Sequence, residues 1–399
     1  MSTTTKPRRG RAVWVVGGVL LGVVLACGLG VGWVVGLFGV FEPDQSPPKA
    51  AMTVQLPADP RLLAWSPDGT KVACGVWGGL PPHVDGAEHQ GAVYVVDATT
   101  GKVVHQATLD DYVQTLAWSP DGRHLAVGTS TSVLNLSPTG PAKLAVFDAD
   151  RFTVKLSATA TANASSFGFV DLAWSPDGRH LYALEGSDVG GVLGGSLRRW
   201  ERAGWEEKPL KQNATPFTAV AVSPDGTRVA GIARAGSGPR FVHLLDADGT
   251  ETGKFATELY TQGRVGFSAD GKLVGVSDGL RPPEWCDPAA MKKVPPKAPR
   301  WAAKPAAVNG VGSVDFDPTF TREARGERRN RPLGMLFGGD KNLGSFLYLT
   351  QLPTGTGTRW RLHGDSGSNS VPVPAFSPDG ARLAVSVGGG ELRVWDVSK

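Results

Sequence analysis

The chain has 399 residues, with 41 Lys and Arg against 37 Asp and Glu, so its formal net charge is +4. Four of the basic residues lie in the first eleven positions: Lys6, Arg8, Arg9 and Arg11. The rest of the chain is balanced, with 37 basic and 37 acidic residues, which argues against nucleic acid as a partner. The three cysteines are too few for a disulfide framework.

The first element in chain order is an uncharged stretch from Ala12 to Phe41, which is long enough to cross a bilayer. Basic residues precede it and acidic ones do not, so the positive-inside rule places the N-terminus in the cytoplasm. The sequence therefore predicts a basic tail over 1–11, a transmembrane helix over 12–41 and a Pro-rich linker over 42–51. The chain is then a single-pass membrane protein whose remainder is extracytoplasmic, either periplasmic or at the cell surface.

Other interpretations of the same N-terminal stretch stay open at this point. A cleaved signal peptide has a shorter apolar core and a small-residue cleavage site, which is not evident here. Cys27 follows "VLA", which faintly resembles a lipoprotein box, and the Arg8–Arg9 pair resembles a twin-arginine export signal. The unbroken apolar length favours the uncleaved anchor.

The stretch "LAWSPDG" occurs three times beyond the linker, at Leu63–Gly69, Leu116–Gly122 and Leu172–Gly178. Looser copies end at Gly226, Gly271 and Gly380, and a degenerate copy, "VDFDP", spans Val314–Pro318. Proline sets φ for the second position of a type I turn, and the glycine takes the left-handed conformation that closes a bulged hairpin. Each copy therefore predicts a strand that runs into a tight hairpin.

Four short strands per copy, separated by turn signals, predict a four-stranded antiparallel sheet. The copies recur about every fifty residues, a period typical of propellers and solenoids. With the degenerate copy there are seven units, so residues 52–399 are predicted to form an all-β, seven-bladed β-propeller. The last unit lacks a fourth strand after "LRVWDV", and "MTVQLPA" at Met52–Ala58 matches the missing one. The N-terminal strand is expected to complete the last blade and close the ring.

These units resemble WD40 repeats, and more closely the WD40-like repeats of bacterial propellers with "SPDG" turns, from about Met52 to Lys399. The repeated Trp65, Trp118 and Trp174 are then expected on the innermost strands, where they fill the gaps between blades. The chain departs from the family in two ways. Only Trp395–Asp396 keeps the "WD" pair, and the Gly-His pair that opens each repeat is absent.

The predicted propeller has two unlike faces. The "SPDG" turns and the third-to-fourth turns share one face, and most of them are short. Longer connections lie on the opposite face, among them 78–91, 130–141, 159–168, 186–195 and 363–372. Long loops gathered on a rigid scaffold are where binding normally resides. We therefore expect an interaction scaffold that holds a protein or peptide on the long-loop face.

The alternative is a small-ligand-binding or hydrolytic propeller, of the lactonase or sugar type, with a site at the mouth of the central channel. The innermost strands offer mainly Leu, Ala, Trp, Val and Phe, and no nucleophile elbow, P-loop or dinucleotide motif is present. No catalytic residue and no cofactor is therefore predicted.

The weak metal candidates are four residues of one loop, His83, Asp85, Glu88 and His89. His124 and His180 occupy the same place in two repeats and are expected at strand starts rather than in catalysis.

A basic excess marks two predicted insertions on the tight-turn face, Pro288–Pro299 and Thr319–Pro332. From Lys292 to Arg331 there are ten Lys or Arg against four acids. Because the linker leaves from the same face, these loops are expected to rest on the anionic membrane surface. The residues in question are Lys292, Lys293, Lys297, Arg325, Arg328 and Arg329. A merely solvated basic loop is the competing interpretation.

Overall fold

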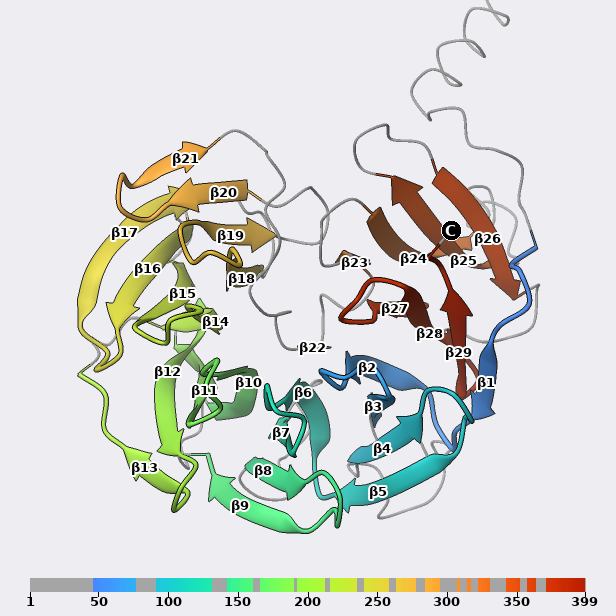
Figure 1. Cartoon of the computed structure of the whole chain (residues 1–399), viewed down its shortest axis with the longest axis horizontal. Helices are drawn as coiled ribbons and strands as arrows, with labels where there is room; N and C mark the ends of the chain where they lie inside the picture. The colour runs from blue at the N-terminus through green and yellow to red at the C-terminus, as the bar shows by residue number, and fades with distance from the viewer. Residues whose placement is uncertain are drawn as a thin grey trace, which may run out of the picture.

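The structure, a computed structural model, describes residues 46–398 except for a set of internal stretches. These are 77–90, 131–141, 161–165, 190–191, 212–215, 235–239, 258–262, 278–283, 295–306, 309–313, 317–321, 331–341, 352–356 and 364–370. Every regular element of the described part is a β-strand, and all of its strand pairs are antiparallel. The strands form sheets that stand around a common axis, which is the architecture of a β-propeller (Figure 1).

Each blade has four antiparallel strands that run from the axis to the rim, and they are in chain order in every blade except the last. The first two blades contain β2 (Pro60–Trp65), β3 (Lys71–Val76), β4 (Gly91–Asp97), β5 (Val103–Leu109), β6 (Tyr112–Trp118), β7 (His124–Ser130), β8 (Lys143–Asp148) and β9 (Val154–Thr159). The next two contain β10 (Ser166–Trp174), β11 (His180–Val189), β12 (Val192–Glu201), β13 (Glu206–Lys208), β14 (Phe217–Val222), β15 (Arg228–Arg234), β16 (Arg240–Asp246) and β17 (Glu251–Thr257).

Two further blades follow along the chain, with one short strand between them. They contain β18 (Arg264–Phe267), β19 (Val274–Ser277), β20 (Glu284–Asp287), β21 (Lys292–Val294), β23 (Val314–Phe316), β24 (Arg322–Asn330), β25 (Asn342–Gln351) and β26 (Gly357–His363). The intervening β22 (Ala307–Val308) pairs with the innermost strand β6 across the ring, at Leu116 and Thr115.

The N-terminal strand closes the ring, as predicted. β27 (Val373–Phe376), β28 (Arg382–Gly388) and β29 (Glu391–Asp396) are joined at the rim by β1 (Met52–Gln55). The register runs from Met52 opposite Val394 to Gln55 opposite Glu391. Met52 and Leu56 are buried, so the closing strand adds apolar contacts as well as backbone hydrogen bonds.

The hydrophobic core lies between the blades, because each sheet presents apolar side chains to both neighbours. In β7, for example, Leu125 and Val127 pack toward the β2–β5 blade, whereas Ala126 packs toward the β10–β13 blade. Among the residues that the structure describes, such apolar clusters join neighbouring blades everywhere except between β18–β21 and β23–β26.

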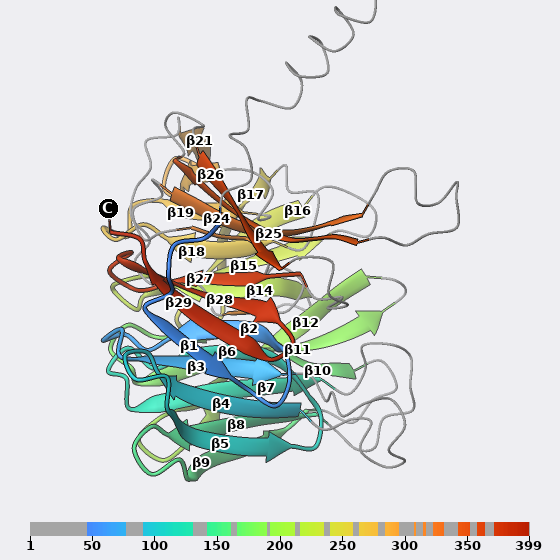
Figure 2. The same cartoon turned by 90° about the vertical axis from the view of Figure 1, so that its right-hand side faces the viewer.

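Three segments predicted as loops contain strands instead. Within 186–195, β11 and β12 continue as a hairpin to the pair Val189 and Val192. The Thr319–Pro332 segment contains β24, which pairs with β25, and Pro288–Pro299 contains the short rim strand β21. Glycine and charge suggested loops, but strand pairing with a long neighbour outweighs these local preferences. The hairpins β11–β12 and β24–β25 extend on the side opposite the tight turns (Figure 2).

The predictions of a single-pass membrane protein and of an extracytoplasmic propeller are corrected by the structure. Within the described residues every element is a strand, and no helix has the length and apolar character that crossing a bilayer requires. The stretch 12–41, from which the transmembrane helix was predicted, lies outside the described residues. An apolar composition shows only that a span is long enough, and it does not by itself produce one.

Candidate functional site at the blade junctions

The repeated "SPDG" turns are closed by their own polar groups. In six copies the serine Oγ donates to the aspartate two residues later at 2.5–2.7 Å: Ser66–Asp68, Ser119–Asp121, Ser175–Asp177, Ser223–Asp225, Ser268–Asp270 and Ser377–Asp379. The amide five residues after the serine donates back to the same Oγ at 2.9 Å in each copy. The glycines have φ of 66° to 73°, the left-handed conformation that the sequence predicts.

Hydrogen bonding keeps these turn carboxylates ionised. Burial acts to raise the pKa of Asp121, but hydrogen bonds from Ser119, Arg202 and the Arg123 amide outweigh it and lower that pKa to about 2. The hydrogen bond from Ser223 is the main cause that lowers the pKa of Asp225, again to about 2. A proton-transfer group needs a pKa near the working pH, so these carboxylates suit a structural role.

The innermost tryptophans join neighbouring blades, as predicted. The indole N–H of each donates to the backbone oxygen of the alanine that lies in the preceding blade. Trp65 donates to Ala375 O at 2.8 Å, Trp118 to Ala64 O at 3.0 Å and Trp174 to Ala117 O at 3.2 Å. These rings are therefore packing residues, and their polar atoms are satisfied within the fold.

Two buried carboxylates connect blades where the following blade has no tryptophan. Asp171 Oδ2 accepts from Val220 N at 2.7 Å, and Asp315 Oδ2 accepts from Phe376 N at the same distance. Each aspartate is only 6% exposed. The next blades carry Val222 and Phe376 at the tryptophan position, so the carboxylate of the preceding blade supplies the hydrogen bond instead.

Arg264 of β18 faces both of these carboxylates. Its Nη1 lies 3.8 Å from Asp315 Oδ1, and its positive charge also acts on Asp171. Burial raises the pKa of Asp171 to about 7, against the Val220 and Leu172 amides and Arg264, which lower it. This group of charged residues was not predicted from the sequence, because the innermost strands are mainly apolar. A charged residue inside an apolar strand pattern, as in "FVDLAW", was the available signal.

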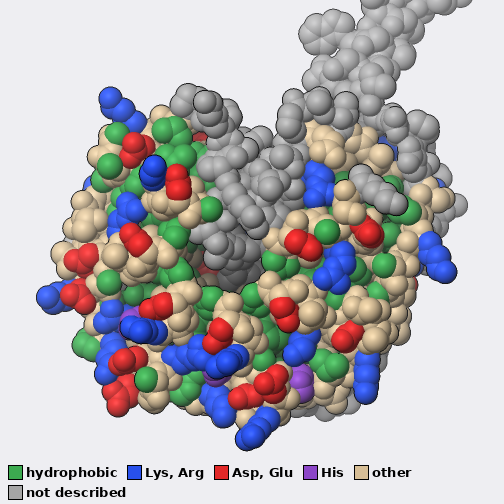
Figure 3. All heavy atoms as spheres, in the orientation of Figure 1, with side chains coloured by type: hydrophobic (Ala, Val, Ile, Leu, Met, Phe, Trp, Pro, Cys, Tyr) green, Lys and Arg blue, Asp and Glu red, His purple; other side chains and the backbone are tan. Residues whose placement is uncertain are grey.

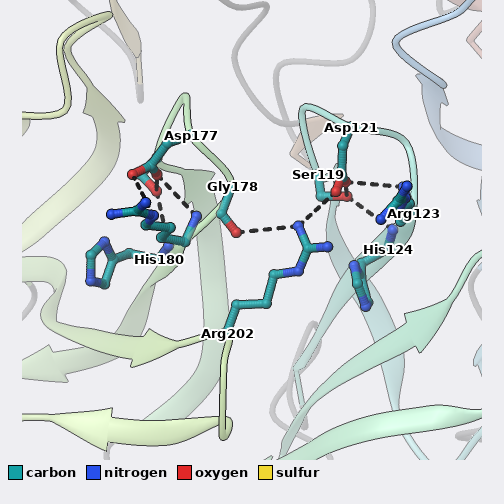
Figure 4. A network of polar contacts seen from close by, with 10 residues as sticks. Ser119, Asp121, Arg123, His124, Asp177, Gly178, His180 and Arg202 are labelled. Atoms are coloured by element: carbon teal, nitrogen blue, oxygen red, sulfur yellow. Dashed lines mark hydrogen bonds and ion pairs between the residues drawn. The ribbon is translucent and has the colours of Figure 1, made fainter.

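On the tight-turn face, an arginine bridges the β6–β9 and β10–β13 blades. Arg202 Nη1 lies 2.7 Å from Asp121 Oδ2 and 3.5 Å from Gly178 O, so the guanidinium sits between two turns (Figure 4). His124 lies beside it, with its ring centroid 5.4 Å from that of Trp205 and 6.3 Å from that of Trp174. Burial, followed by the Arg202 charge, lowers the pKa of His124.

Arginines of three other blades also bridge two blades, but they reach forward to the turn of the following blade. Arg228 donates to Gly271 O at 2.7 Å, Arg322 to Gly380 O at 2.5 Å, and Arg382 to Gly69 O. Each guanidinium also lies over an aromatic ring of the next blade, at 4.8–5.6 Å from its centroid: Phe267, Phe376 and Trp65 respectively. Lys and Arg alternate with Asp and Glu across this face, so its charge is mixed (Figure 3).

Only some of the predicted site residues lie in the described part of the chain. His124 and His180 stand at the starts of β7 and β11, as expected. The metal candidates His83, Asp85, Glu88 and His89 lie outside the described residues, and within those residues no group of His, Cys, Asp and Glu is placed to hold a metal ion.

The basic residues predicted to face a membrane are spread over two blades. Lys292 and Lys293 belong to β21, where Lys293 Nζ lies 3.1 Å from Glu284 Oε2. Arg325 lies over the Tyr348 ring at 5.5 Å, Arg328 and Arg329 belong to β24, and Lys297 lies outside the described residues. Their contact with a lipid surface stays a prediction.

A family model described as "WD domain, G-beta repeat" matches residues 102–134. Two curated relatives, which are versions of one subunit of eukaryotic translation initiation factor 3 from two strains of Cryptococcus neoformans var. neoformans serotype D, are 30% identical over 125 residues. That match covers 30% of this chain, and the chain spans only 17% of the length of these relatives.

A solved structure titled "Crystal Structure of Mitotic Checkpoint Complex" contains a chain similar in fold, with a TM-score of 0.53 and 16% identity. The likeness covers 90% of this chain and 97% of that one, and at this identity it concerns the fold alone. The protein therefore carries a WD40 repeat at residues 102–134 within a β-propeller.

Proposed function

We propose that this protein is a seven-bladed WD40-type propeller that acts as a protein-interaction scaffold and binds its partner on the long-loop face. The blade count is supported by the strand pairings, which group into seven sets of four: β2–β5, β6–β9, β10–β13, β14–β17, β18–β21, β23–β26, and β27–β29 with β1. WD40 propellers typically serve as scaffolds for protein partners, and the matched relatives are named as a factor subunit and as a complex.

The observation that carries this proposal is the contrast between the two faces. On the tight-turn face, serine, aspartate and backbone groups hydrogen-bond one another, which leaves short, rigid turns. On the opposite face, β11–β12 and β24–β25 extend past the ends of the other strands (Figure 2). Hairpins that project from a rigid ring present a partner with surface that is held in place before binding.

The test shortens both hairpins without changing the ring. Replacing 187–194 by Asn-Gly leaves Gly186 opposite Gly195, and replacing 329–344 by Asn-Gly leaves Arg328 opposite Ser345. Asn-Gly suits the two-residue turn that each pair then requires. We expect proteins that co-purify with the full chain from its own cells to be lost, while its melting temperature stays within a few degrees.

The matched control is the double variant Arg123→Ser and Arg179→Ser, which changes exposed side chains on the tight-turn face. It should keep the same partners. If the control loses the partners and the shortened hairpins keep them, the binding face is wrong. If the full chain hydrolyses a lactone, and Asp171→Asn abolishes that turnover, the small-ligand alternative replaces the scaffold.

A further inference from the structure

The Arg202 bridge belongs to a turn whose sequence is repeated in the next blade. The hexapeptide "SPDGRH" spans Ser119–His124 and again Ser175–His180. The two turns have the same internal bonds: Ser175 Oγ donates to Asp177 Oδ1 at 2.6 Å, and the Arg179 amide donates to that oxygen at 2.9 Å. His180, like His124, begins the second strand beside the turn (Figure 4).

In the first copy the guanidinium comes from the blade that follows. Arg202 is the residue after β12, and its amide donates to Arg179 O at 2.7 Å. Its side chain reaches back to Asp121 of the preceding blade and touches Gly178 O of its own blade. A Cβ placed on Gly178 would lie 3.1 Å from Arg202 Nη1, so the guanidinium covers this glycine.

In the second copy, the position that corresponds to Arg202 has only a methyl side chain. The residue after β16 is Ala247, and the glycine of the following turn is Gly226. A Cβ placed on Gly226 would meet no heavy atom within 4 Å among the described residues. The Asp177 side chain is 53% exposed, and its Oδ2 has Arg179 Nε at 3.7 Å, a loose contact from a side chain that is itself 80% exposed.

The other groups at this junction leave the acceptors accessible. Arg199 approaches from β12, but its guanidinium donates to the backbone oxygen of Ala247 and to the Tyr182 hydroxyl. The junction therefore offers a carboxylate oxygen, a turn carbonyl and an imidazole, the same kinds of group that surround Arg202 one blade earlier. That set of groups is selective for the planar, multidentate guanidinium over the compact ammonium group of lysine.

We propose that the junction of Asp177, His180 and Gly226 on the tight-turn face is a receptor for an arginine side chain presented by a protein partner. The guanidinium donates to Asp177 Oδ2 and to Gly226 O and lies against the His180 ring, as Arg202 does between Asp121, Gly178 and His124. This site is on the face opposite the long loops. A test of this site is therefore independent of a test of the proposed scaffold face.

The direct test uses a small probe. The full chain, with its seven histidines isotope-labelled, is titrated with N-acetyl-arginine-methylamide, and the imidazole resonances are followed by NMR. The His180 signal, assigned from His180→Gln, should shift and saturate. The citrulline analogue, which has the same shape and no charge, should leave it unmoved. Asp177→Asn should weaken binding about tenfold, the effect of losing one charge-assisted contact.

A second test supplies the arginine from the chain itself. Ala247→Arg should abolish the probe-induced shift and raise the melting temperature by about 2 °C, and Asp177→Asn should remove that gain. Ala149→Arg is the matched control, because it places an arginine at the equivalent point after β8, facing Asp68, whose Oδ2 already accepts from Thr70 Oγ1 at 2.9 Å. Equal shifts with arginine and citrulline, or no His180 shift with either, would overturn the proposal.

Discussion

At the scale of single residues, the third-to-fourth turns contain bulky side chains in an unfavourable backbone conformation. Phe152, Trp205 and Met291 have φ of 53°, 56° and 50°, where Gly101 of another repeat has 73°. Each side chain packs on the preceding blade. Phe152 stacks on His105 at 4.9 Å, Trp205 makes an edge-to-face contact with His124 at 5.4 Å, and a Cβ placed on Gly253 would clash with Met291 Cε. Contacts between blades therefore outweigh a backbone cost of about 1–2 kcal/mol.

This balance makes a prediction for Phe152, which also stacks on Phe147 at 4.6 Å. Phe152→Ala should lower the free energy of unfolding by roughly 2 kcal/mol, because the aromatic contacts are lost and the strained φ remains. Phe152→Gly should be about 1 kcal/mol more stable than Phe152→Ala, since glycine adopts this φ freely. The measurement is denaturant unfolding of both variants.

Val154 of β9 provides the control, because its φ is not positive and its side chain is 54% exposed. There the order should reverse, with Val154→Ala more stable than Val154→Gly. If the alanine variant is more stable than the glycine variant at both positions, backbone strain at Phe152 does not affect the free energy of unfolding.

At the scale of elements, the closing strand holds together the two ends of the described chain. β1 pairs with β29 over four residues, Leu56 N donates to Gly390 O at 2.8 Å, and Trp395 Nε1 donates to Pro48 O at 2.8 Å. The segment before β1 therefore covers the last blade as well. Without it, the outer edge of β29 would be open to pairing with other chains.

Deletion of Met52–Ala58 should therefore cause aggregation or lower the melting temperature by at least 10 °C. Loss of buried Met52 and Leu56 alone should cost about 4 kcal/mol or more, at roughly 2 kcal/mol or more for each side chain. Differential scanning calorimetry with light scattering reports both effects. The double variant Thr53→Ser and Pro57→Ser changes exposed residues of the same segment and should behave as the parent chain. A monomeric deletion variant that melts like the parent would show that β1 does not close the ring.

At the scale of the whole molecule, two sets of carboxylates give the stability opposite pH dependences. The turn aspartates have lowered pKa values, about 2 for Asp121 and Asp225, so their contribution is lost as the pH falls below about 4. Asp171 has a raised pKa of about 7, so the folded state binds its proton more tightly than the unfolded chain does. Its contribution is complete below about pH 4 and is lost as the pH rises to 7.

The melting temperature should therefore be highest near pH 4–5 and fall on both sides. The decline from pH 5 to 7.5 should shrink in Asp171→Asn, which cannot ionise, although that variant starts from a lower value because one backbone hydrogen bond is lost. Asp150→Asn, on an exposed turn, should keep the decline. A stability that rises steadily from pH 4 to pH 8 in the parent chain would mean that Asp171 is ionised throughout.

Local chemistry accounts for the features that could be predicted from the amino-acid sequence. The "SPDG" turns and the strands on either side of them follow from residues close together in the chain. The four-stranded sheets and the closing role of Met52–Ala58 follow from the repetition. Turn geometry depends on proline, glycine and short-range side-chain hydrogen bonds, so six copies could be located without coordinates. The packing role of Trp65, Trp118 and Trp174 followed from the same repetition.

Contacts between residues of different blades could be found only in the folded ring. Asp171, Arg264 and Asp315 come from three blades and are brought together when the ring closes, so nothing in their spacing predicted the contact. The hairpin over 186–195 formed because a long strand pairs through glycines that suggested a loop. The Arg202 bridge, and the open position over Gly226, depend on how one blade packs against the next. That setting is determined by packing between sheets, which a single repeat does not encode.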